Sequence, residues 1–586
     1  MRRIASLVVT FVMFVTFVML ATLSGAAGAA GAQVSANASA RGAAPVARFD
    51  WFEYSGHDSV YDVHPAGPGE YANPILAGFY PDPSLARVGD DYYLISSTFA
   101  YFPGIPIFHS KDLVDWTQIG NVIHRPEQLK FDSLGMSRGV FAPTINYHAG
   151  TFYVLNTCVD CGGNYLVTAT NPAGPWSNPV WIPEVGGIDP SIFFDDDGKA
   201  YVINNDEPTG GSTYQGHRAI WIREFDVAAK KVKGPATQII NGGVDITQKP
   251  IWIEGPHIYK IDGKYYLSCA EGGTAVDHRQ VVFRSDHVLG PYVPAPAPIN
   301  PILTQRLLDP SRPFPVTSSG HADFLKTQAG EWWGIFLATR PYDDDYYNTG
   351  RETFLLPVEW KDGWPTFVGG REPVPYAVRR PKLPAQPAPA IPTHGNFTVR
   401  EEFNGSTLAP YWLMLRTPRE RWWTLGGGAL TMRARPDDIA DKGQPSFVGR
   451  RQQHQRATFT TAMHFTPARA GDRAGLVAFQ SESFFYAMTV TLADGQPVVQ
   501  VERRAGTSDT PVVVASKPLS ARAGAPVYLR IDADGGRYRF SFATERDRWN
   551  PVLENADGKI LSTKGAGGAG ANFTGVVVGM YAHSAP

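Results

Sequence analysis

The stretch DPSIFFDDDGKAYVINN, residues 189–205, carries the pattern that decides the fold. An apolar run enters a turn of Asp and Gly residues, and an alternating strand that contains tyrosine leaves it. This order is typical of a β-hairpin. The pattern begins with Asp189 directly before Pro190, and proline pushes the residue before it out of the α region. We therefore expect Asp189, and likewise Asp82 before Pro83, to be extended, at the entrance of a strand.

Four other segments repeat this pattern, each followed ten to twelve residues later by an aromatic pair or its equivalent after a tight turn. They are DPSLAR from Asp82, APTINY from Ala142, EGPHIY from Glu254 and HADFLK from His321. In chain order the five copies start 60, 47, 65 and 67 residues apart. Blocks of hairpins at such periods are typical of propeller blades. The sequence predicts an all-β chain with a five-bladed β-propeller over residues 71–378.

The first residue of each copy bears on function. In a propeller, the innermost strand of every blade lines the central channel, so equivalent positions face the axis. This alignment predicts that Asp82, Asp189, Glu254 and His321 converge on one spot, with Ala142 in the remaining copy. An Asp-Pro pair alone is common turn chemistry. A turn does not explain why three of five copies carry an acid in the same register.

Converging carboxyl groups indicate proton chemistry, because like charges and burial both raise a carboxyl pKa. Glycoside hydrolysis needs one protonated carboxyl group as acid and one ionised group as base or nucleophile. Glu254 has the longer side chain and suits the acid. Asp82, short and held beside a proline, suits a base that positions water, although the residues alone leave a nucleophile possible. No metal-ligand cluster is expected nearby.

At this point the chain resembles glycoside hydrolase family 43, a five-bladed propeller family of inverting enzymes. The resemblance rests on NPILAGFYPDPSLARVGDDYYLISSTFAYFPGIPIFHSKDLVDW, GIDPSIFFDDDGKAYV, IEGPHIYKIDGKYYL and SGHADFLKTQAGEWW, and it extends from about Phe49 to the C-terminus. It implies that Asp82 is the general base, Asp189 an acid that orients its neighbours and tunes their pKa, and Glu254 the general acid.

The resemblance also implies residues that bind substrate. Phe99 and Phe141 match aromatic residues of the sugar pocket, and Arg351 matches an arginine that hydrogen-bonds sugar hydroxyls. His321 matches a histidine under the pocket floor that contacts a central water or a calcium ion. A structural calcium ion is thus allowed, and no organic cofactor is needed.

A second domain follows a proline-rich spacer at residues 379–395. From residue 396 to 586, short alternating runs are separated by Gly, Asp and Pro turns, which predicts a β-sandwich. This part resembles the C-terminal sandwich of the β-xylosidase-like branch of the family. In that branch a sandwich loop places a phenylalanine at the rim of the active site, and the matching stretch NFTGVVVG nominates Phe573.

The N-terminus reads as a targeting segment. Arg2 and Arg3 precede a long apolar run and small residues that end near Ala32. This predicts a signal peptide at 1–32 and a secreted protein, with an uncleaved membrane anchor as the alternative. Residues 33–70 are assigned to an N-terminal extension.

Cys158 and Cys161 form a CxxC pair that we interpret as a small structural disulfide loop or as incidental.

These features predict a secreted, inverting exo-glycosidase that removes terminal xylose or arabinofuranose from xylan or its oligosaccharides. The net charge of −2 gives no reason to expect nucleic acid or a membrane surface as a partner once the signal is removed. The sequence does not indicate an oligomeric state. Two alternatives remain: a retaining fructosidase-like enzyme with an aspartate nucleophile, and a carbohydrate-binding protein without turnover.

Overall fold

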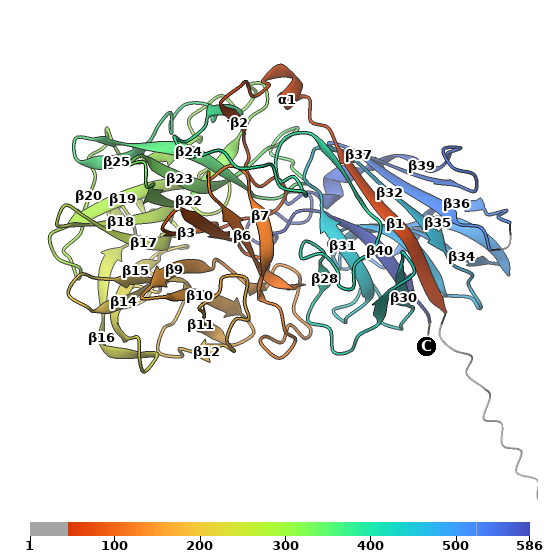
Figure 1. Ribbon diagram of the computed structural model, residues 1–586, viewed down its shortest axis with the longest axis horizontal. Helices are drawn as coiled ribbons and strands as arrows, with labels where there is room; N and C mark the ends of the chain where they lie inside the picture. Colours follow the sequence, from red (N-terminus) through yellow and green to blue (C-terminus); the bar gives the residue numbers. More distant parts are fainter. Residues whose placement is uncertain (1–44, 523, 586) are drawn as a thin grey trace, which may run out of the picture. The chain divides into compact units, whose positions relative to one another are not determined.

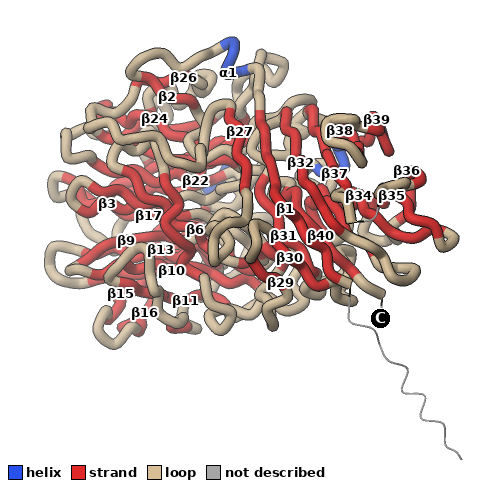
Figure 2. The backbone as a smooth tube through the Cα atoms, turned by 45° about the vertical axis from the view of Figure 1, so that its right-hand side comes forward, coloured by secondary structure: helices blue, strands red, loops and turns tan. Residues whose placement is uncertain are grey.

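The computed structural model describes residues 45–522 and 524–585, and this part of the chain is almost entirely β-structure (Figures 1 and 2). The predicted signal segment, residues 1–32, lies outside the described residues. Helical structure in the described part is confined to α1 (Val60–Val63) and two 3-10 turns, η1 (Ile246–Gln248) and η2 (Gly558–Leu561). Among the described residues, no helix has the length and apolar character needed to cross a bilayer.

Five antiparallel sheets follow one another along the chain and form the predicted five blades of the propeller. Blade 1 contains β3 (Ser84–Val88), β4 (Asp91–Ile95), β6 (Gly104–Ser110) and β7 (Thr117–Ile123). Blade 2 contains β8 (Gly139–Val140), β9 (Thr144–His148), β10 (Thr151–Val159), β11 (Gly163–Ala169) and β12 (Val180–Trp181). Blade 3 contains β13 (Ile188–Phe194), β14 (Ala200–Asp206), β15 (Ala219–Asp226) and β16 (Lys231–Asn241). Blade 4 contains β17 (Glu254–Ile261), β18 (Lys264–Glu271), β19 (Arg279–Ser285), β20 (Val293–Pro294) and β21 (Leu303–Thr304). Blade 5 contains β22 (Thr317–Lys326), β23 (Trp332–Thr339), β24 (Glu352–Lys361) and β25 (Trp364–Phe367).

The hairpins form where the sequence places tight turns. Between β17 and β18, Asp262 and Gly263 both have positive φ, +51° and +77°. Two consecutive residues with positive φ are the requirement of a type I′ turn, which matches the twist of the strands that it joins. In blade 2, the disulfide bond between Cys158 and Cys161 spans the turn from β10 to β11.

The innermost strands, β3, β9, β13, β17 and β22, contact one another in a closed circle. Asp323 on β22 is the main polar junction of this circle. Its carboxyl group accepts hydrogen bonds from Ser84 Oγ (2.9 Å) and Leu85 N (2.8 Å) of blade 1 and from the Tyr259 hydroxyl (2.7 Å) of blade 4. Ser84 Oγ in turn accepts from Ile145 N of blade 2 (3.1 Å).

The remaining blades are joined in the same way. Thr144 Oγ1 of blade 2 donates to the Pro190 carbonyl of blade 3 at 2.8 Å. Ser191 Oγ of blade 3 donates to the Pro256 carbonyl of blade 4 at 2.6 Å. These contacts and those of Asp323 form an axial ring of hydrogen bonds that links every blade to the next, including blade 5 to blade 1. The circle is therefore closed by side chains, without a strand shared between blades.

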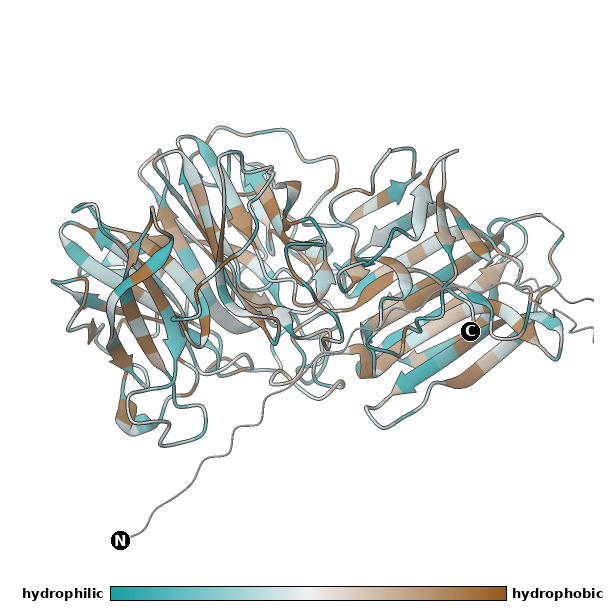
Figure 3. Cartoon of the chain, turned by 90° about the horizontal axis from the view of Figure 1, so that it is seen from below, coloured by the Kyte–Doolittle hydropathy of each residue, from teal (hydrophilic) through white to brown (hydrophobic). Residues whose placement is uncertain are grey.

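The sandwich consists of two sheets with opposed apolar faces, and brown and teal bands alternate along many of its strands in Figure 3. The larger sheet contains β29 (Trp423–Leu425), β30 (Leu430–Arg433), β1 (Val46–Gly56), β32 (Arg456–His464), β37 (Val527–Asp534), β38 (Arg537–Ala543) and β39 (Asn550–Asp557), with β27 (Phe397–Glu401) also paired to β1. The smaller sheet contains β31 (Ser446–Arg451), β40 (Val577–His583), β33 (Arg473–Ser481), β34 (Phe484–Ala493), β35 (Gln496–Ala505) and β36 (Val512–Pro518).

One domain assignment needs correction. Residues 46–56, assigned to an N-terminal extension, form β1, which pairs with β27, β30 and β32 of the sandwich. In Figure 1 this red strand lies among the blue strands of the C-terminal half. Its Phe49, Phe52 and Tyr54 are fully buried in the sandwich core. The sandwich is therefore built from both ends of the described chain.

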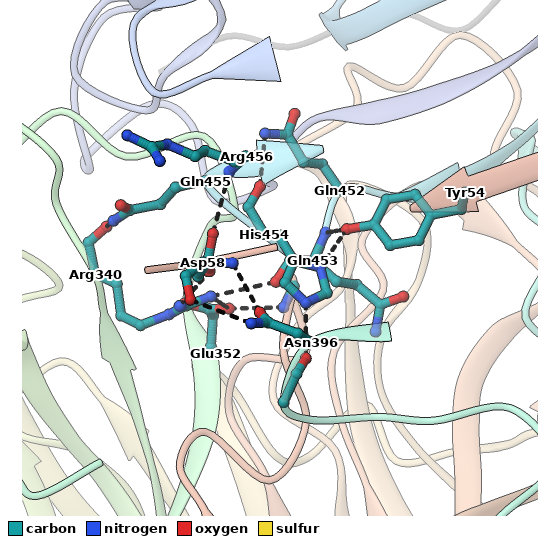
Figure 4. A network of polar contacts seen from close by, with 12 residues as sticks. Tyr54, Asp58, Arg340, Glu352, Asn396, Gln452, Gln453, His454, Gln455 and Arg456 are labelled. Atoms are coloured by element: carbon teal, nitrogen blue, oxygen red, sulfur yellow. Dashed lines mark hydrogen bonds and ion pairs between the residues drawn. The ribbon is translucent and has the colours of Figure 1, made fainter. Parts of the chain in front are cut away.

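Propeller and sandwich are joined by buried polar groups and by a shared core. Arg340, which follows β23 and is 1% exposed, pairs with Asp58 (2.7 Å) after β1 and with Glu352 (2.6 Å) on β24 (Figure 4). It also donates to the Gln453 carbonyl, between β31 and β32, at 3.2 Å. The short pairing of β5 (Tyr101–Phe102) with β28 (Met414–Leu415) adds to this interface. Within the propeller, β2 (Glu70–Ala72) pairs with β26 (Ala377–Arg379) and ties the two ends of the propeller segment together.

The axial ring generates a stability prediction. Asp323→Ala removes this acceptor from the buried donors of Ser84 and Leu85 and from the partly buried hydroxyl of Tyr259. Each such donor costs about 1–3 kcal/mol, so the free energy of unfolding should fall by about 3 kcal/mol or more. Urea unfolding followed by tryptophan fluorescence measures the loss. The control Asp90→Ala changes an exposed turn residue of blade 1 and should stay within about 0.5 kcal/mol; equal effects of the two substitutions would contradict the role of the ring.

Candidate active site

A cavity of about 560 Å³ opens on the propeller axis, and all eight residues nominated from the sequence line it. They come from blades 1, 2, 3, 4 and 5 and from the sandwich: Asp82, Phe99, Phe141, Asp189, Glu254, His321, Arg351 and Phe573. The predicted convergence of residues far apart in the sequence is therefore present in the structure.

The backbone lifts the axial residues out of the strand ladder. Asp82, Asp189 and His321 have φ values of +54°, +56° and +51°, each two residues before the first regular pairing of its blade. The expectation that both aspartates are extended is therefore wrong. In blades 3 and 5 the pairing register shifts at this point, which is the mark of a β-bulge. Bulges redirect side chains near active sites, and the left-handed backbone is a strain that the surrounding packing must hold.

Glu254 does not occupy the equivalent position. Gly255, with φ +56°, stands where Asp82 and Asp189 stand, and Glu254 precedes it by one residue. A Cβ at residue 255 would lie 2.9 Å from the His321 ring, so a side chain there would collide with blade 5. The acid of blade 4 is therefore supplied from one residue earlier, and the longer glutamate side chain reaches the cavity from there.

Asp82 is held in its ionised form. Arg351 Nη1 lies 3.0 Å from Asp82 Oδ1, and Ser97 Oγ donates to Oδ2 at 2.5 Å. Burial alone would raise the pKa of Asp82, but Arg351, His321 and the Ser97 hydroxyl outweigh it and lower the pKa below its ordinary value. The carboxylate is thus charged over the whole neutral range.

Glu254 and Asp189 have the opposite environment. Burial, followed by the charges of Asp189 and Asp82, raises the pKa of Glu254 well above its ordinary value. Burial and the charge of Asp82 raise the pKa of Asp189 to about 7, although its Oδ2 accepts a hydrogen bond from Gly255 N (3.2 Å). One cavity therefore holds a carboxylate that favours charge and a carboxyl group that favours its proton.

His321 lies beside these acids, with Nδ1 3.9 Å from Asp82 Oδ1. Burial lowers the pKa of His321 to about 4, so the imidazole is neutral at neutral pH. Ligand atoms of Asp189, Glu254 and His321 lie within 4.8 Å of one another. Calcium takes six to eight oxygen ligands, and these three side chains supply only two carboxyl groups and an imidazole. They do not make a calcium site by themselves.

Three phenylalanines form an aromatic wall beside Asp82. Phe99 and Phe573 are stacked with centroids 5.8 Å apart, and Phe141 lies edge-on to both at 5.6 and 5.5 Å. The Arg351 guanidinium lies 5.9 Å from the Phe99 centroid and 5.5 Å from that of Phe573. The sandwich thus supplies the third ring of this wall.

A close backbone contact holds Phe573 in this position. A Cβ on Gly575 would lie 2.6 Å from the Thr349 carbonyl carbon, and one on Gly350 would lie 2.8 Å from Gly575 N. Only two glycines can approach so closely. The contact brings the sandwich loop before β40 against the residue that precedes Arg351, and so sets both side chains in one cavity.

Several lining residues were missed from the sequence. Ile251 and Trp252 lie on the blade 4 side of the cavity, and Arg138 lies near Phe141 with its guanidinium 5.8 Å from the ring centroid. Arg218, on the loop before β15, lies with its guanidinium 5.3 Å from the Trp252 centroid. Ile251, Trp252 and Arg138 come from loops between blades, and Arg218, which contacts Trp252 without lining the cavity, comes from the loop between β14 and β15 of blade 3. The hairpin repeat aligns none of these loops. The available signal was the tryptophan two residues before the candidate acid, in PIWIEGP.

Comparison with known proteins supports the same fold. A family model described as glycosyl hydrolases family 43 matches residues 71–365, and one described as a beta xylosidase C-terminal Concanavalin A-like domain matches residues 400–586. A xylosidase/arabinosidase of Butyrivibrio fibrisolvens is 37% identical over 87% of this chain and 95% of its own length. A non-reducing end alpha-L-arabinofuranosidase of Bacteroides ovatus is 38% identical over 87% of this chain and 91% of its own length.

Solved structures agree. A family 43 enzyme from the capybara gut metagenome covers 92% of this chain and 100% of its own, with a TM-score of 0.84 and 39% identity. A xylan beta-1,4-xylosidase of Bacillus halodurans covers 88% of this chain and 96% of its own, with a TM-score of 0.78 and 33% identity. With three carboxyl groups converging on a propeller axis and a sandwich completing the pocket, the chain belongs to glycosyl hydrolase family 43 and is a glycoside hydrolase.

Proposed function

We propose that this glycoside hydrolase removes terminal β-xylose or α-L-arabinofuranose from xylan-type chains with inversion of configuration. The observation that carries the proposal is the contrast between Asp82, whose pKa is lowered, and Glu254, whose pKa is raised, within one cavity. Hydrolysis with inversion needs this pair, a carboxylate that activates water and a carboxylic acid that protonates the leaving oxygen.

Each acid has one role in this mechanism. Asp82, fixed by Arg351 and Ser97, accepts a proton from the water that attacks the anomeric carbon. Glu254 gives its proton to the glycosidic oxygen as the bond breaks. Asp189 acts on Glu254: its charge contributes to the raised pKa of Glu254. Its carboxyl group also accepts a hydrogen bond from Gly255 N, which holds the segment of Asp189 against the segment of Glu254. Proton transfer by such a positioned acid contributes about 10²–10⁴-fold to the rate.

Exo action is supported by how the cavity is bounded. The aromatic wall of Phe99, Phe141 and Phe573 lies on the Asp82 side, and Ala569 and Gly570 of the sandwich loop also line the cavity. A volume of about 560 Å³ is in the range of small-ligand pockets. A pocket bounded at one end accepts the end of a chain and excludes its interior.

The choice of sugar rests on the relatives, whose names include both xylosidase and arabinofuranosidase. We also propose secretion, from Arg2, Arg3 and the apolar run that follows them.

Release of nitrophenol from the β-xyloside and the α-L-arabinofuranoside, measured side by side, tests which sugar is removed. Proton NMR of the first-formed sugar tests inversion, since a retaining enzyme would release the anomer that it was given. A protein that binds both glycosides and releases neither product would be a carbohydrate-binding protein instead.

The role of Glu254 predicts a substrate-dependent loss. Glu254→Gln cannot donate the proton, so turnover of a disaccharide should fall by about 10²–10⁴-fold. A dinitrophenyl glycoside has a leaving group that needs no proton, and its hydrolysis should fall far less. Steady-state kinetics on both substrates measure the difference. The control Glu184→Gln removes an exposed carboxyl group outside the cavity and should change neither rate; equal losses on both substrates would remove Glu254 from the acid role.

The ion pair between Arg351 and Asp82 predicts a shift of the pH profile. Arg351 lowers the pKa of both Asp82 and Glu254, so Arg351→Met should raise both. The base then becomes ionised only at higher pH and the acid keeps its proton to higher pH, so both limbs of the kcat/KM profile should move upward. The control Arg138→Met removes the other arginine of the cavity, which pairs with Asp160, and should leave both limbs in place. Limbs that stay fixed or move downward in Arg351→Met would contradict this electrostatic role.

A further inference from the structure

The blade 4 side of the cavity carries an aromatic surface that the mechanism above does not use. Ile251 and Trp252 are each 40% exposed, whereas Phe99, another large apolar side chain of the cavity, is 1% exposed. Trp252 also has φ +50°, a conformation that a bulky residue rarely adopts. Strained, exposed aromatic residues at the edge of a cavity are candidates for ligand contact.

The ring of Trp252 is held in place from one side. The Arg218 guanidinium lies 5.3 Å from its centroid, and Arg218 Nε donates to Asn205 Oδ1 at 3.0 Å. The backbone is fixed as well, because Trp252 N donates to the Gly216 carbonyl at 2.8 Å. A Cβ on Gly216 would lie 2.8 Å from Ile251 Cβ, so this approach requires glycine. The indole is thus a rigid platform with much of its surface exposed.

The position of Glu254 determines what this platform faces. The proton donor must lie beside the glycosidic oxygen, between the sugar that is released and the group that leaves. The released sugar is bounded by the aromatic wall near Asp82 and Arg351. Trp252 lies two residues before Glu254, on the segment that enters β17. Resting on the proposed function, we infer that Trp252, with Ile251 beside it, is the platform on which the leaving-group sugar packs, and that it determines the preference for glycan over small leaving groups.

The test compares two substrates that share the released sugar. One is the disaccharide whose leaving group is xylose, and the other is the glycosyl fluoride of the same sugar and anomeric configuration, which has no ring to pack. Trp252→Ala should lower kcat/KM for the disaccharide about tenfold or more, as expected for loss of an aromatic contact, and change that for the fluoride less than twofold. Trp252→Phe should restore most of the loss, since it keeps an aromatic face.

Two controls separate this role from others. Trp181 on β12 is 41% exposed and outside the cavity, so Trp181→Ala should leave kcat/KM unchanged for both substrates. If Trp252 acted only through Arg218 and the proton on Glu254, Trp252→Ala would move the alkaline limb of the disaccharide profile; we expect that limb to stay in place. A moved limb, equal losses on both substrates, or no loss on the disaccharide would overturn the inference. Failure of the proposed function is distinct, because the wild-type enzyme would then hydrolyse neither substrate.

Discussion

The axial ring of hydrogen bonds is the constraint on which the rest of the structure depends. The five sheets share no strand, so side chains on the axis join the innermost strands of blades 5 and 1, in addition to the β2–β26 pairing outside the blades. Asp323 does this by accepting from Ser84, Leu85 and Tyr259, whose blades lie on either side of it. Ser84 and Leu85 are buried and Tyr259 is partly buried, so each donor would be costly if left without an acceptor. The ring therefore fixes the distance between the innermost strands, and through it the separation of every group above it.

Three residues of the cavity, Asp82, Asp189 and His321, each stand two residues before a member of this ring. Ser84, Ser191 and Asp323 begin regular pairing, and Asp82, Asp189 and His321 precede them with positive φ. A small displacement of one strand would move a carboxyl group directly, because only one residue separates each aspartate from the ring residue of its blade. The strained backbone is tolerable here because the ring and the neighbouring blades over-determine it. The hydrogen bonds that stabilise the propeller axis therefore also determine the positions of the carboxyl groups in the cavity.

The sequence predicts the structure well where the same hairpin occurs in the same position of every blade. The hairpin period located the blades, and the aligned register placed Asp82, Asp189 and His321 correctly at the axis. It was off by one residue at Glu254, because the need for glycine at 255 arises from the His321 ring, which lies in another blade. Strand β1 was missed for a similar reason: its partner strand β32 follows some four hundred residues later, and no local pattern links the two. Trp252 lies on a loop between blades, where the repeat carries no information.

The charges in the cavity explain why one of the three carboxyl groups keeps its proton, and which one. Three carboxyl groups, Asp82, Asp189 and Glu254, are buried together, and two guanidinium groups, Arg351 and Arg218, act on them. Two cations offset two carboxylates, so a third negative charge would be buried without a partner, which is strongly unfavourable. Arg351 contacts Asp82 directly at 3.0 Å, so the charge is most stable there and the proton is retained farther away, with Glu254 as its preferred site. Because the carboxyl groups titrate as a coupled set, the position of one arginine decides which of three similar acids becomes the base and which the proton donor.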